Sequence, residues 1–264
     1  MEKLLIIPTY NEKENVAAIL ETVFSLQQNF HVLIIDDGSP DGTADIVKSL
    51  FSRYEGMLFL EERFGKLGLG TAYIMGFRWA LARGYQYIFE MDCDFSHNPR
   101  DLDRLYNACK NEGSDVAVGS RYVKGGDVEN WPLIRIGISK GASAYTRLIT
   151  FMPVKDPTAG FVCYKSEVLD AINLDQISFV GYAFQIEMKF AAWKLGFKIK
   201  EVPITFVDRK FGVSKMNKGI VKEGIFGVLK LKWMSMFKNY RSRVKNVHEE
   251  NPYHNKHKVL LERK

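Results

Sequence analysis

Short apolar runs alternate with longer helical patterns over the first 120 residues, and this alternation constrains the fold more than any other feature of the sequence. It is typical of βαβ units built around a parallel sheet. Runs such as Leu4-Leu5-Ile6-Ile7 are apolar throughout, as expected where helices cover both faces of the sheet. We therefore expect an α/β fold with a mostly parallel central sheet. The predicted strands are 4–8, 32–36, 57–60, 87–91 and 116–119, and the predicted helices lie near 15–26, 43–51, 71–83 and 101–111.

The pattern becomes irregular after Gly119. A loop at 125–132 is followed by predicted helices near 135–150 and 184–195, a strand at 198–202 and a long helix at 220–237. No repeat or low-complexity linker divides the chain. We expect one domain over residues 1–217 and a C-terminal appendage, residues 218–264, made of an interfacial helix and a basic tail.

Positive charge is concentrated in that appendage. The chain carries a net charge of +6, but residues 218–264 hold 12 Lys and Arg against 4 acidic residues, or +8, which leaves 25 − 27 = −2 for the rest. Such a local field attracts an anionic membrane surface or nucleic acid, and a solvated tail is the alternative. The helix at 220–237 is apolar but interrupted by Lys and Glu, so it either lies in a membrane interface or packs on the body.

The sequence gives no sign of a membrane span or of secretion. Its longest stretch without Asp, Glu, Lys or Arg is 22–35, which contains Gln, Asn and His, whereas a span needs about 18 or more apolar residues. The N-terminus has no signal-peptide pattern. The three cysteines, Cys93, Cys109 and Cys163, are an odd number without metal-ligand spacing, which favours a reducing compartment. We expect a cytoplasmic protein.

Polar residues collect where the predicted strands end, which is where open α/β sheets bind ligands. Asp92 and Asp94 leave a buried strand two residues apart, so both carboxylates can point into one crevice. Such hard oxygen ligands suit Mg²⁺ or Mn²⁺, completed by phosphate oxygens of a substrate. Asp-x-Asp alone also recurs in ordinary loops. Its position after a predicted strand favours the metal site.

A second acidic group, Asp36-Asp37, precedes a turn that leads into a helix. A carboxylate there can accept hydrogen bonds from a ribose or a base, or it can cap the turn. We expect Asp37 to bind ligand and Asp41 to hold the turn. Gly68-Leu69-Gly70 does not complete a dinucleotide-binding motif, because Tyr73 occupies the position of its last glycine.

The second half of the chain supplies cations that could bind phosphate groups. Arg offers a bidentate grip and Lys a point charge. Each cation could singly be a surface residue, but together with a metal held by carboxylates they indicate a site for several phosphates. The candidates are Arg121, Arg135, Lys140, Arg209 and Lys215.

Five motifs in order resemble the dolichol-phosphate (polyprenol-phosphate) mannosyltransferases of glycosyltransferase family 2, over roughly residues 3–235. The resemblance implies a GT-A type nucleotide-diphospho-sugar transferase fold. It also implies transfer of mannose from GDP-mannose to a polyprenyl phosphate, with inversion at the anomeric carbon. The motifs are Pro8-Thr9-Tyr10-Asn11-Glu12, Asp36-Asp37-Gly38-Ser39-Pro40-Asp41-Gly42-Thr43, Lys66-Leu67-Gly68-Leu69-Gly70-Thr71-Ala72-Tyr73, and the segments 91–99 and 206–215.

The resemblance also implies roles for single residues. It makes Asp92, Asp94, Arg121 and Arg209 the catalytic group, and it assigns the divalent metal to Asp92, Asp94 and Ser96. The acceptor phosphate would face Arg135, Ser139 and Lys140, the last of which is often Arg in the family. The guanosine would be held by Pro8, Tyr10, Glu12, Ile35, Asp37 and Cys93, and the donor phosphates by Arg121, Arg209 and Lys215.

This chemistry fits the residues present. A phosphate monoester has its second pKa near 6 and is already anionic at neutral pH, so the acceptor needs no general base. The departing GDP needs its charge stabilised, which a metal and several cations supply. Asp156 is a candidate for orienting these groups.

The expected partners are GDP-mannose, a polyprenyl phosphate lipid and an anionic membrane surface on the cytoplasmic side, with a separate membrane-tethering subunit left open. Three alternatives remain at this stage. The first is glucosyl transfer from UDP-glucose to the same lipid, the second is a non-enzymatic polyanion-binding protein, and the third is a catalytically silent scaffold with a GT-A fold. Nucleic acid is not an expected partner, because no RNA-binding motif interleaves basic and aromatic residues.

Overall fold

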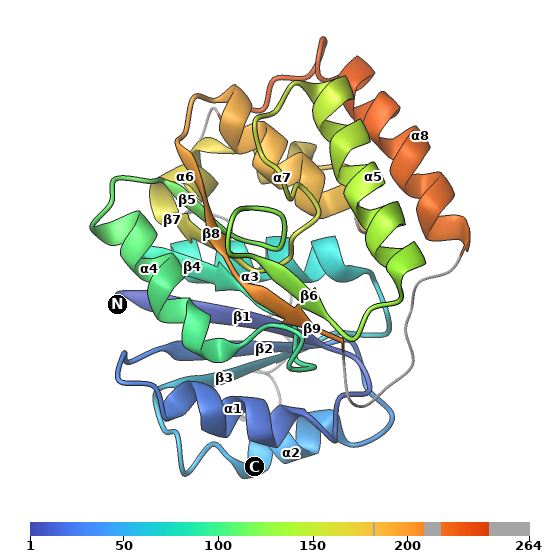
Figure 1. The fold of residues 1–264 in the computed structure, drawn as a ribbon. Coiled ribbons are helices and arrows are strands. Elements are labelled where there is room, and N and C mark those ends of the chain that lie inside the picture. The colour runs from blue at the N-terminus through green and yellow to red at the C-terminus, as the bar shows by residue number, and fades with distance from the viewer. Residues whose placement is uncertain (182, 209–217, 243–264) are drawn as a thin grey trace.

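A seven-stranded sheet organises the chain in the computed structural model, which describes residues 1–181, 183–208 and 218–242 (Figure 1). Its strand order is β3-β2-β1-β4-β7-β5-β8, and β7 runs antiparallel to both of its neighbours while the other pairs are parallel. The prediction of an α/β fold with a mostly parallel sheet is confirmed. The strands are β1 (Lys3–Thr9), β2 (His31–Asp36), β3 (Leu58–Glu62), β4 (Tyr87–Glu90), β5 (Val116–Ser120), β7 (Val162–Lys165) and β8 (Ile199–Pro203).

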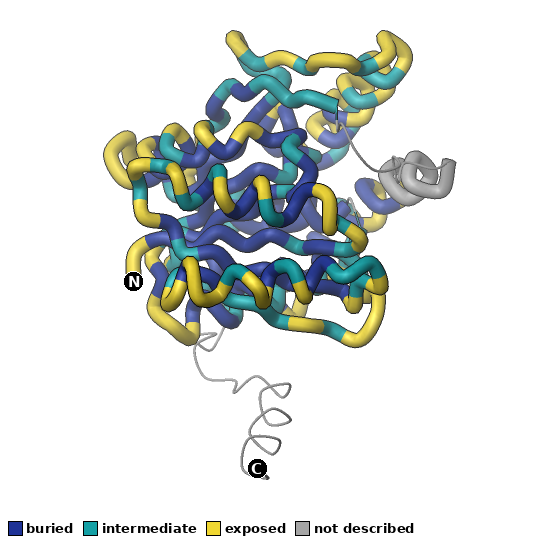
Figure 2. Tube along the Cα trace, turned by 90° about the horizontal axis from the view of Figure 1, so that it is seen from below, coloured by how far each residue is buried: buried dark blue, intermediate teal, exposed yellow. Residues whose placement is uncertain are grey.

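Alternate residues of each inner strand face opposite cores, because successive side chains of a strand point to opposite faces. Leu4 and Ile6 of β1 enter one buried cluster, and Leu5 and Ile7 enter the other. The first cluster is covered by α3 (Leu69–Ala82), α6 (Ser166–Ala171) and α7 (Ala183–Lys194), and the second by α1 (Val16–Phe24), α2 (Thr43–Ser49) and α4 (Leu102–Lys110). The inner strands are buried on both faces, as the dark tube through the middle of Figure 2 shows.

The predicted strands and helices of the first 120 residues all appear, within a few residues at their ends. The sequence reading missed β7, which enters the sheet between β4 and β5. It also missed α6 and the small parallel sheet of β6 (Asp127–Glu129) and β9 (Thr205–Val207). The missed strands have three or four residues each, too few to establish an alternation of apolar and polar side chains. The described residues also form two short 3-10 helices, η1 (Pro99–Asp101) and η2 (Leu174–Gln176).

Two long helices lie side by side away from the sheet, α5 (Leu133–Thr150) and α8 (Lys218–Met234) (Figure 1). Helix α8 packs against α5 and α7, and the chain then returns to the body. There Asn173 N–H donates to Tyr240 C=O over 2.8 Å, and Ser242 N–H donates to Ala171 C=O over 2.8 Å. The division of the chain at residue 217 stays a prediction, and residues 243–264 lie outside the described part. No helix among the described residues is long and apolar enough to cross a membrane.

Candidate functional site

The carboxyl ends of β1, β2 and β4 meet at one edge of the sheet. Thr9 pairs with Asp36 in the β1–β2 register, and Asp37 N–H donates to Thr9 C=O over 3.0 Å. On the other side of β1, Glu90 pairs with Ile6, which places the turn that begins at Met91 beside the end of β1. The two acidic groups singled out in the sequence therefore lie at the same edge.

Asp36 and Asp41 shape the turn between β2 and α2. Asp36 accepts hydrogen bonds from Thr9 Oγ1 over 2.8 Å and from Ser39 N–H over 2.8 Å. Asp41 accepts from Thr43 N–H over 3.0 Å and from Thr43 Oγ1 over 2.6 Å. Burial raises the pKa of Asp41, but the hydrogen bonds from Thr43 and Lys13 outweigh it and hold that pKa below its usual value. Asp41 holds the turn, as expected.

Asp37 is oriented by Arg63, a residue that the sequence analysis did not single out. Arg63 Nε donates to Asp37 Oδ1 over 2.6 Å, and both side chains are nearly buried. Arg63 also donates from Nη1 to Thr71 Oγ1 over 2.7 Å and from Nη2 to Gly68 C=O over 3.3 Å, at the start of α3. None of the hydrogen bonds within the described part of the chain ends on Asp37 Oδ2. The sequence feature that could have identified Arg63 is its position just before the Lys66–Tyr73 motif.

Three other predicted nucleoside-binding residues, Pro8, Ile35 and Tyr10, lie at or just after the ends of β1 and β2. Pro8 pairs with Ile35, whose side chain is fully buried against α3 and so supports the strand end from below. Lys66 Nζ lies over the Tyr10 ring, 5.0 Å from the ring centroid.

Glu12 and Cys93 lie near each other at the same edge. Glu12 accepts from Asn15 Nδ2 over 2.9 Å. Burial raises the pKa of the Cys93 thiol, and the neighbouring carboxylates of Glu12 and Asp94 raise it further. Cys93 is therefore a neutral thiol beside both carboxylates.

The turn after β4 holds the predicted metal ligands. Ser96 N–H donates to Asp94 Oδ1 over 3.0 Å, and Ser96 C=O accepts from Val207 N–H of β9 over 3.2 Å. Asp94 is almost buried, whereas 41% of the Asp92 side chain is exposed. The turn is tight, with Phe95 at a φ of +59°. Asp92, Asp94 and Ser96 thus lie in one short turn at the sheet edge.

His97 supports this turn from the core side. Asp92 N–H donates to His97 Nδ1 over 3.4 Å, and the ring stacks on Phe161 with centroids 5.0 Å apart. Burial lowers the pKa of His97 to about 4, so the ring is neutral near neutral pH and its Nδ1 can accept this hydrogen bond. The burial of His97 in the core fits a structural role.

The donor set fits a divalent cation that is only partly held by protein. The described residues contain no cluster of three or more His, Cys, Asp and Glu side chains arranged for a metal. Mg²⁺ commonly uses one or two carboxylates together with substrate phosphates and water, and Mn²⁺ likewise prefers oxygen ligands. Asp92 and Asp94 offer such a pair, with Asp94 already oriented by Ser96.

Arg121 is held by Asp156 in a bidentate pair. Its Nε donates to Asp156 Oδ2 over 2.7 Å and its Nη2 to Oδ1 over 2.6 Å, while Thr158 Oγ1 accepts over 2.9 Å. Asp156 is fully buried, and the Arg121 guanidinium lies 5.5 Å from the ring centroids of Trp131 and Phe206. Asp156 therefore orients Arg121, in agreement with the expectation that it orients a group of the site.

The three predicted acceptor-binding residues lie together on the first turns of α5. Arg135 Nη1 donates to Asp208 Oδ2 over 2.9 Å, and its guanidinium lies 4.0 Å from the Trp131 ring centroid. Tyr122 OH donates to Ser139 Oγ over 2.6 Å, and Lys140 Nζ lies 6.0 Å from the Tyr122 ring centroid. Trp131 thus borders both Arg121 and Arg135. Arg209 and Lys215, the remaining predicted phosphate ligands, lie outside the described residues.

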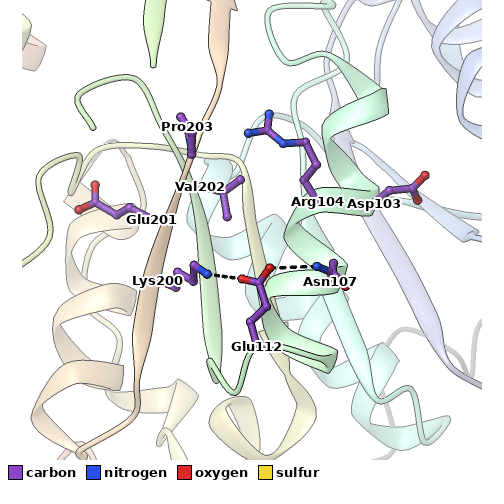
Figure 3. A pocket seen from close by; sticks show the side chains of 8 residues that line it. All are labelled: Asp103, Arg104, Asn107, Glu112, Lys200, Glu201, Val202 and Pro203. Atoms are coloured by element: carbon purple, nitrogen blue, oxygen red, sulfur yellow. Dashed lines mark hydrogen bonds and ion pairs between the residues drawn. The ribbon is translucent and has the colours of Figure 1, made fainter. Parts of the chain in front are cut away.

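A separate pocket of about 470 Å³ lies between α4 and the edge strand β8 (Figure 3). Glu112 pairs there with Lys200 and accepts from Asn107 Nδ2 over 3.0 Å. No predicted site residue lines it, so it is not the candidate site. Its lining residues are Asp103, Arg104, Asn107, Glu112, Lys200, Glu201, Val202 and Pro203.

Two curated proteins are similar to this chain over most of its length. Polyprenol monophosphomannose synthase from Mycolicibacterium smegmatis is 45% identical over 225 residues, which cover 85% of this chain and 84% of that protein. Undecaprenyl-phosphate mannosyltransferase from Micrococcus luteus is 43% identical over 244 residues, which cover 92% of this chain and 99% of that protein.

Solved structures share the fold at low identity. Glucosyl-3-phosphoglycerate synthase from Mycobacterium tuberculosis, in complex with Mn²⁺, UDP and glucosyl-3-phosphoglycerate, matches with a TM-score of 0.63 and 16% identity over 88% of this chain and 79% of that chain. A mannosyltransferase from Pyrobaculum calidifontis, in complex with GDP-Man and Mn²⁺, matches with a TM-score of 0.56 and 14% identity over 92% of this chain and 67% of that chain. These likenesses indicate a GT-A type fold.

The family model described as glycosyl transferase family 2 matches residues 4–172, which include the strand-end carboxylates and the start of α5. With the two close relatives and the GT-A type fold, it identifies the chain as a member of glycosyltransferase family 2.

Proposed function

We propose that this glycosyltransferase transfers mannose from GDP-mannose to a polyprenyl phosphate, giving polyprenyl-phosphate mannose and GDP. The observation that carries the proposal is the 43% identity to the undecaprenyl-phosphate mannosyltransferase, since the match spans 92% of this chain and nearly all of that protein. The strand-end site supports it, because carboxylates and oriented cations lie where a nucleoside diphosphate and a phosphate could bind together.

The nucleoside end of the donor would occupy the region of Pro8, Tyr10, Glu12, Asp37 and Cys93. Arg63 holds Asp37 Oδ1, so Oδ2 could accept hydrogen bonds from a base or a ribose. Asp36 and Asp41 keep the surrounding turn in place without using Asp37. The guanine-containing donor is supported by the Pyrobaculum mannosyltransferase, whose complex contains GDP-Man.

Asp92 and Asp94 would hold Mg²⁺ or Mn²⁺, with Ser96 orienting Asp94 through its backbone N–H. The metal, when bound, would neutralise charge on the diphosphate as it leaves. Arg121 follows β5, which runs parallel to β4, so it lies at the same edge of the sheet. Asp156 fixes its orientation through two hydrogen bonds. We assign Arg121, Arg209 and Lys215 to the donor phosphates, and with them Arg121 and Arg209 to the stabilisation of the transition state.

The acceptor phosphate would bind at the start of α5, against Arg135, Ser139 and Lys140. Within the described part of the chain, two buried donors there have no hydrogen-bond partner, Arg135 Nε and Trp131 Nε1. Buried donors normally find a partner, so this pair suits an anionic oxygen. Arg135 lies beside the Trp131 ring, and this ring also borders Arg121. An acceptor phosphate bound by Arg135 and Trp131 would therefore lie near the donor phosphates bound by Arg121.

The reaction would then be a direct displacement with inversion. A phosphate oxygen of the lipid attacks the anomeric carbon, the bond from that carbon to the GDP oxygen breaks, and its electron pair leaves with GDP. The nucleophile is already anionic at neutral pH. No proton has to be removed from it, and neutral His97 can remain in the core as a support of the metal-binding turn.

A membrane location fits an apolar surface on α5, α8 and the residues that directly follow these helices, called here the α5–α8 surface. Leu133 and Phe237 are 85% and 78% exposed, although large apolar side chains are usually buried. Lys140, Arg147, Lys230 and Lys232 lie on the same two helices and could reach anionic headgroups. We propose that this surface rests on the cytoplasmic face of a membrane. Its exposed apolar residues are Leu133, Ile134, Ile138, Leu148, Phe151, Phe226, Leu229, Trp233, Met236 and Phe237.

The proposal is tested by measuring nucleotide release. The purified protein should release GDP from GDP-mannose only when a polyprenyl phosphate and Mg²⁺ or Mn²⁺ are both present. Arg135→Ala should raise the polyprenyl phosphate concentration needed for half-maximal release while leaving GDP affinity unchanged. Release of UDP from UDP-glucose at the same rate would support the glucosyl alternative instead.

A further inference from the structure

A series of hydrogen-bonded, buried polar side chains lies next to the turn that carries Asp92 and Asp94, called here the metal-binding turn. Glu90, the last residue of β4, is fully buried and accepts a hydrogen bond from Gln185 Nε2 over 2.9 Å. Gln185 Oε1 in turn accepts from Lys189 Nζ over 3.1 Å, one helical turn further along α7. Lys189 Nζ also donates to Gln185 C=O over 3.0 Å and to Ala159 C=O over 2.6 Å. Both ends of the Gln185 amide and all three Lys189 donors are thus engaged.

The two ends of this series of hydrogen bonds lie in different parts of the candidate site. Glu90 is two residues before Asp92, on the strand that leads into the metal-binding turn. Ala159 lies three residues after Asp156, in the loop whose Asp156 and Thr158 hold Arg121. The Glu90–Gln185–Lys189 chain therefore connects the turn that carries Asp92 and Asp94 with the loop that fixes Arg121.

Stability alone does not account for these residue types. Gln185 and Lys189 lie among apolar neighbours of α7 such as Ile186 and Met188, and all four are buried. Replacing buried polar groups together with their hydrogen-bond partners by apolar side chains of the same shape is often neutral or stabilising. Burial also acts against the charge of Lys189, because it lowers the pKa of that ammonium group. Apolar side chains at these positions would not form the hydrogen bonds that connect the Asp156 loop with the metal-binding turn.

We propose that Gln185 and Lys189 are positioning residues that set the placement of the Asp156 loop, and with it Arg121, relative to the metal-binding turn. The inference rests on the proposed function, since it assigns them to the donor diphosphate site. A misplacement of about 1 Å can lower a rate by roughly 100-fold. Neither residue touches substrate in this scheme.

Lys189→Met and Gln185→Met remove the link while retaining most of the side-chain volume. Met188→Leu, a conservative change on the same helix, is the matched control. We expect both link variants to lower kcat by about 10-fold to 100-fold with the KM for GDP-mannose changed less than about threefold. Met188→Leu should keep both constants. Glu90→Gln retains an oxygen acceptor for Gln185 Nε2 and should keep kcat within about threefold, whereas Glu90→Leu should not.

A second measurement separates this inference from the proposed function. The affinity for GDP is measured with and without Mn²⁺ in wild type and in each folded variant. In wild type Mn²⁺ should strengthen GDP binding, and the strengthening factor should fall at least about fivefold in Lys189→Met and Gln185→Met but not in Met188→Leu. This result stands even if no lipid product forms, in which case only the acceptor assignment fails.

The inference is overturned if folded link variants keep the wild-type kcat and the wild-type Mn²⁺ effect on GDP binding. It is also overturned if activity falls only in proportion to the folded fraction, because that result assigns the two residues to stability. Should Lys189→Met not fold, Gln185→Met carries the test, since it retains the lysine and its hydrogen bond to Ala159.

Discussion

Arg63 and Asp37 form a nearly buried ion pair at the carboxyl end of β2, with 7% and 10% of their side chains exposed. Arg63 follows β3 and also contacts the start of α3, so the orientation of Asp37 is set by elements outside its own strand. Asp37, the carboxylate assigned to the nucleoside, is therefore held through Arg63 by the segment after β3 and the start of α3. We therefore expect the proposed role of Asp37 to depend on Arg63, which makes no proposed contact with the nucleotide.

Arg63→Met should weaken GDP binding by about 10-fold or more, because Asp37 would lose the partner that orients it in a nearly buried site. The polyprenyl phosphate dependence should remain as in wild type. Arg53→Met removes an exposed pair with Glu21 and serves as the control. Isothermal titration with GDP checks the result, and wild-type affinity in Arg63→Met would mean that Asp37 does not need this orientation.

Asp92→Asn and Asp94→Asn should each reduce metal-dependent transfer by at least about 100-fold while leaving the fold intact. The loss arises because a neutral amide is a far weaker ligand for a hard divalent cation than a carboxylate is. Asp45→Asn, at an exposed position of α2, is the control for a charge change elsewhere. Full activity in EDTA, or in both site variants, would remove the metal from the scheme.

The metal-free protein should lose stability as pH falls from about 6.5 to about 4. The folded pKa of His97 is about 4, below its ordinary value of 6.5, so the unfolded chain binds more protons in that interval. The free energy of unfolding should therefore fall by on the order of 2 kcal/mol between about pH 7.5 and about pH 5 through this group alone.

Urea unfolding of wild type and His97→Gln in EDTA measures this contribution. Other titrating groups act on both proteins, so the difference between the two pH dependences isolates His97. The same slope in both would show that His97 contributes no pH dependence in this range.

Ile134→Ser together with Leu148→Ser should weaken binding to anionic vesicles by about 100-fold or more, because full burial of each aliphatic side chain contributes about 1.5–3 kcal/mol. Both side chains lie on the α5–α8 surface. Phe51→Ser removes an exposed aromatic that follows α2, a helix that lies far from α5 and α8 in Figure 1, and should change nothing. Equal vesicle binding in all three proteins would remove this surface as the docking face.

The basic tail is best removed after Ser242. Residues 243–264 carry 6 Lys and Arg against 3 acidic residues, or +3, and their deletion should reduce the salt dependence of vesicle binding. A cut after Phe237 would also remove Lys238, whose Nζ lies 2.7 Å from the fully buried Glu187 Oε1. That cut should destabilise the fold, because the buried Glu187 would lose the cation with which it pairs.

The strand ends were predictable because each depends on local pattern. Apolar runs located β1, β2 and β4, and the acidic residues after them were visible in the same stretch of sequence. The partners of those acidic residues were not predictable in the same way. Arg63 reaches Asp37 across 26 residues and Asp156 reaches Arg121 across 35, and no local periodicity encodes such pairs.

The C-terminal helix shows the same limit. Its apolar composition was compatible with packing on the body or with lying in a membrane interface, and the structure has both a packed and an exposed face. Val228 and Leu231 are buried, whereas Phe226 and Trp233 are exposed. The contribution of α5 to the exposed surface was missed, because Leu133 and Ile134 begin a helix whose other residues are largely polar or small.

The mass and anomeric configuration of the lipid product test the proposed activity most directly. Incubation of the full chain with GDP-mannose, a polyprenyl phosphate and Mn²⁺ should give a lipid heavier by one hexose, with the mannose β-linked to phosphate. The β linkage follows because GDP-mannose carries mannose in the α configuration and a single displacement inverts it. A lipid that gains hexose only from UDP-glucose, or an α-linked product, would contradict the proposal.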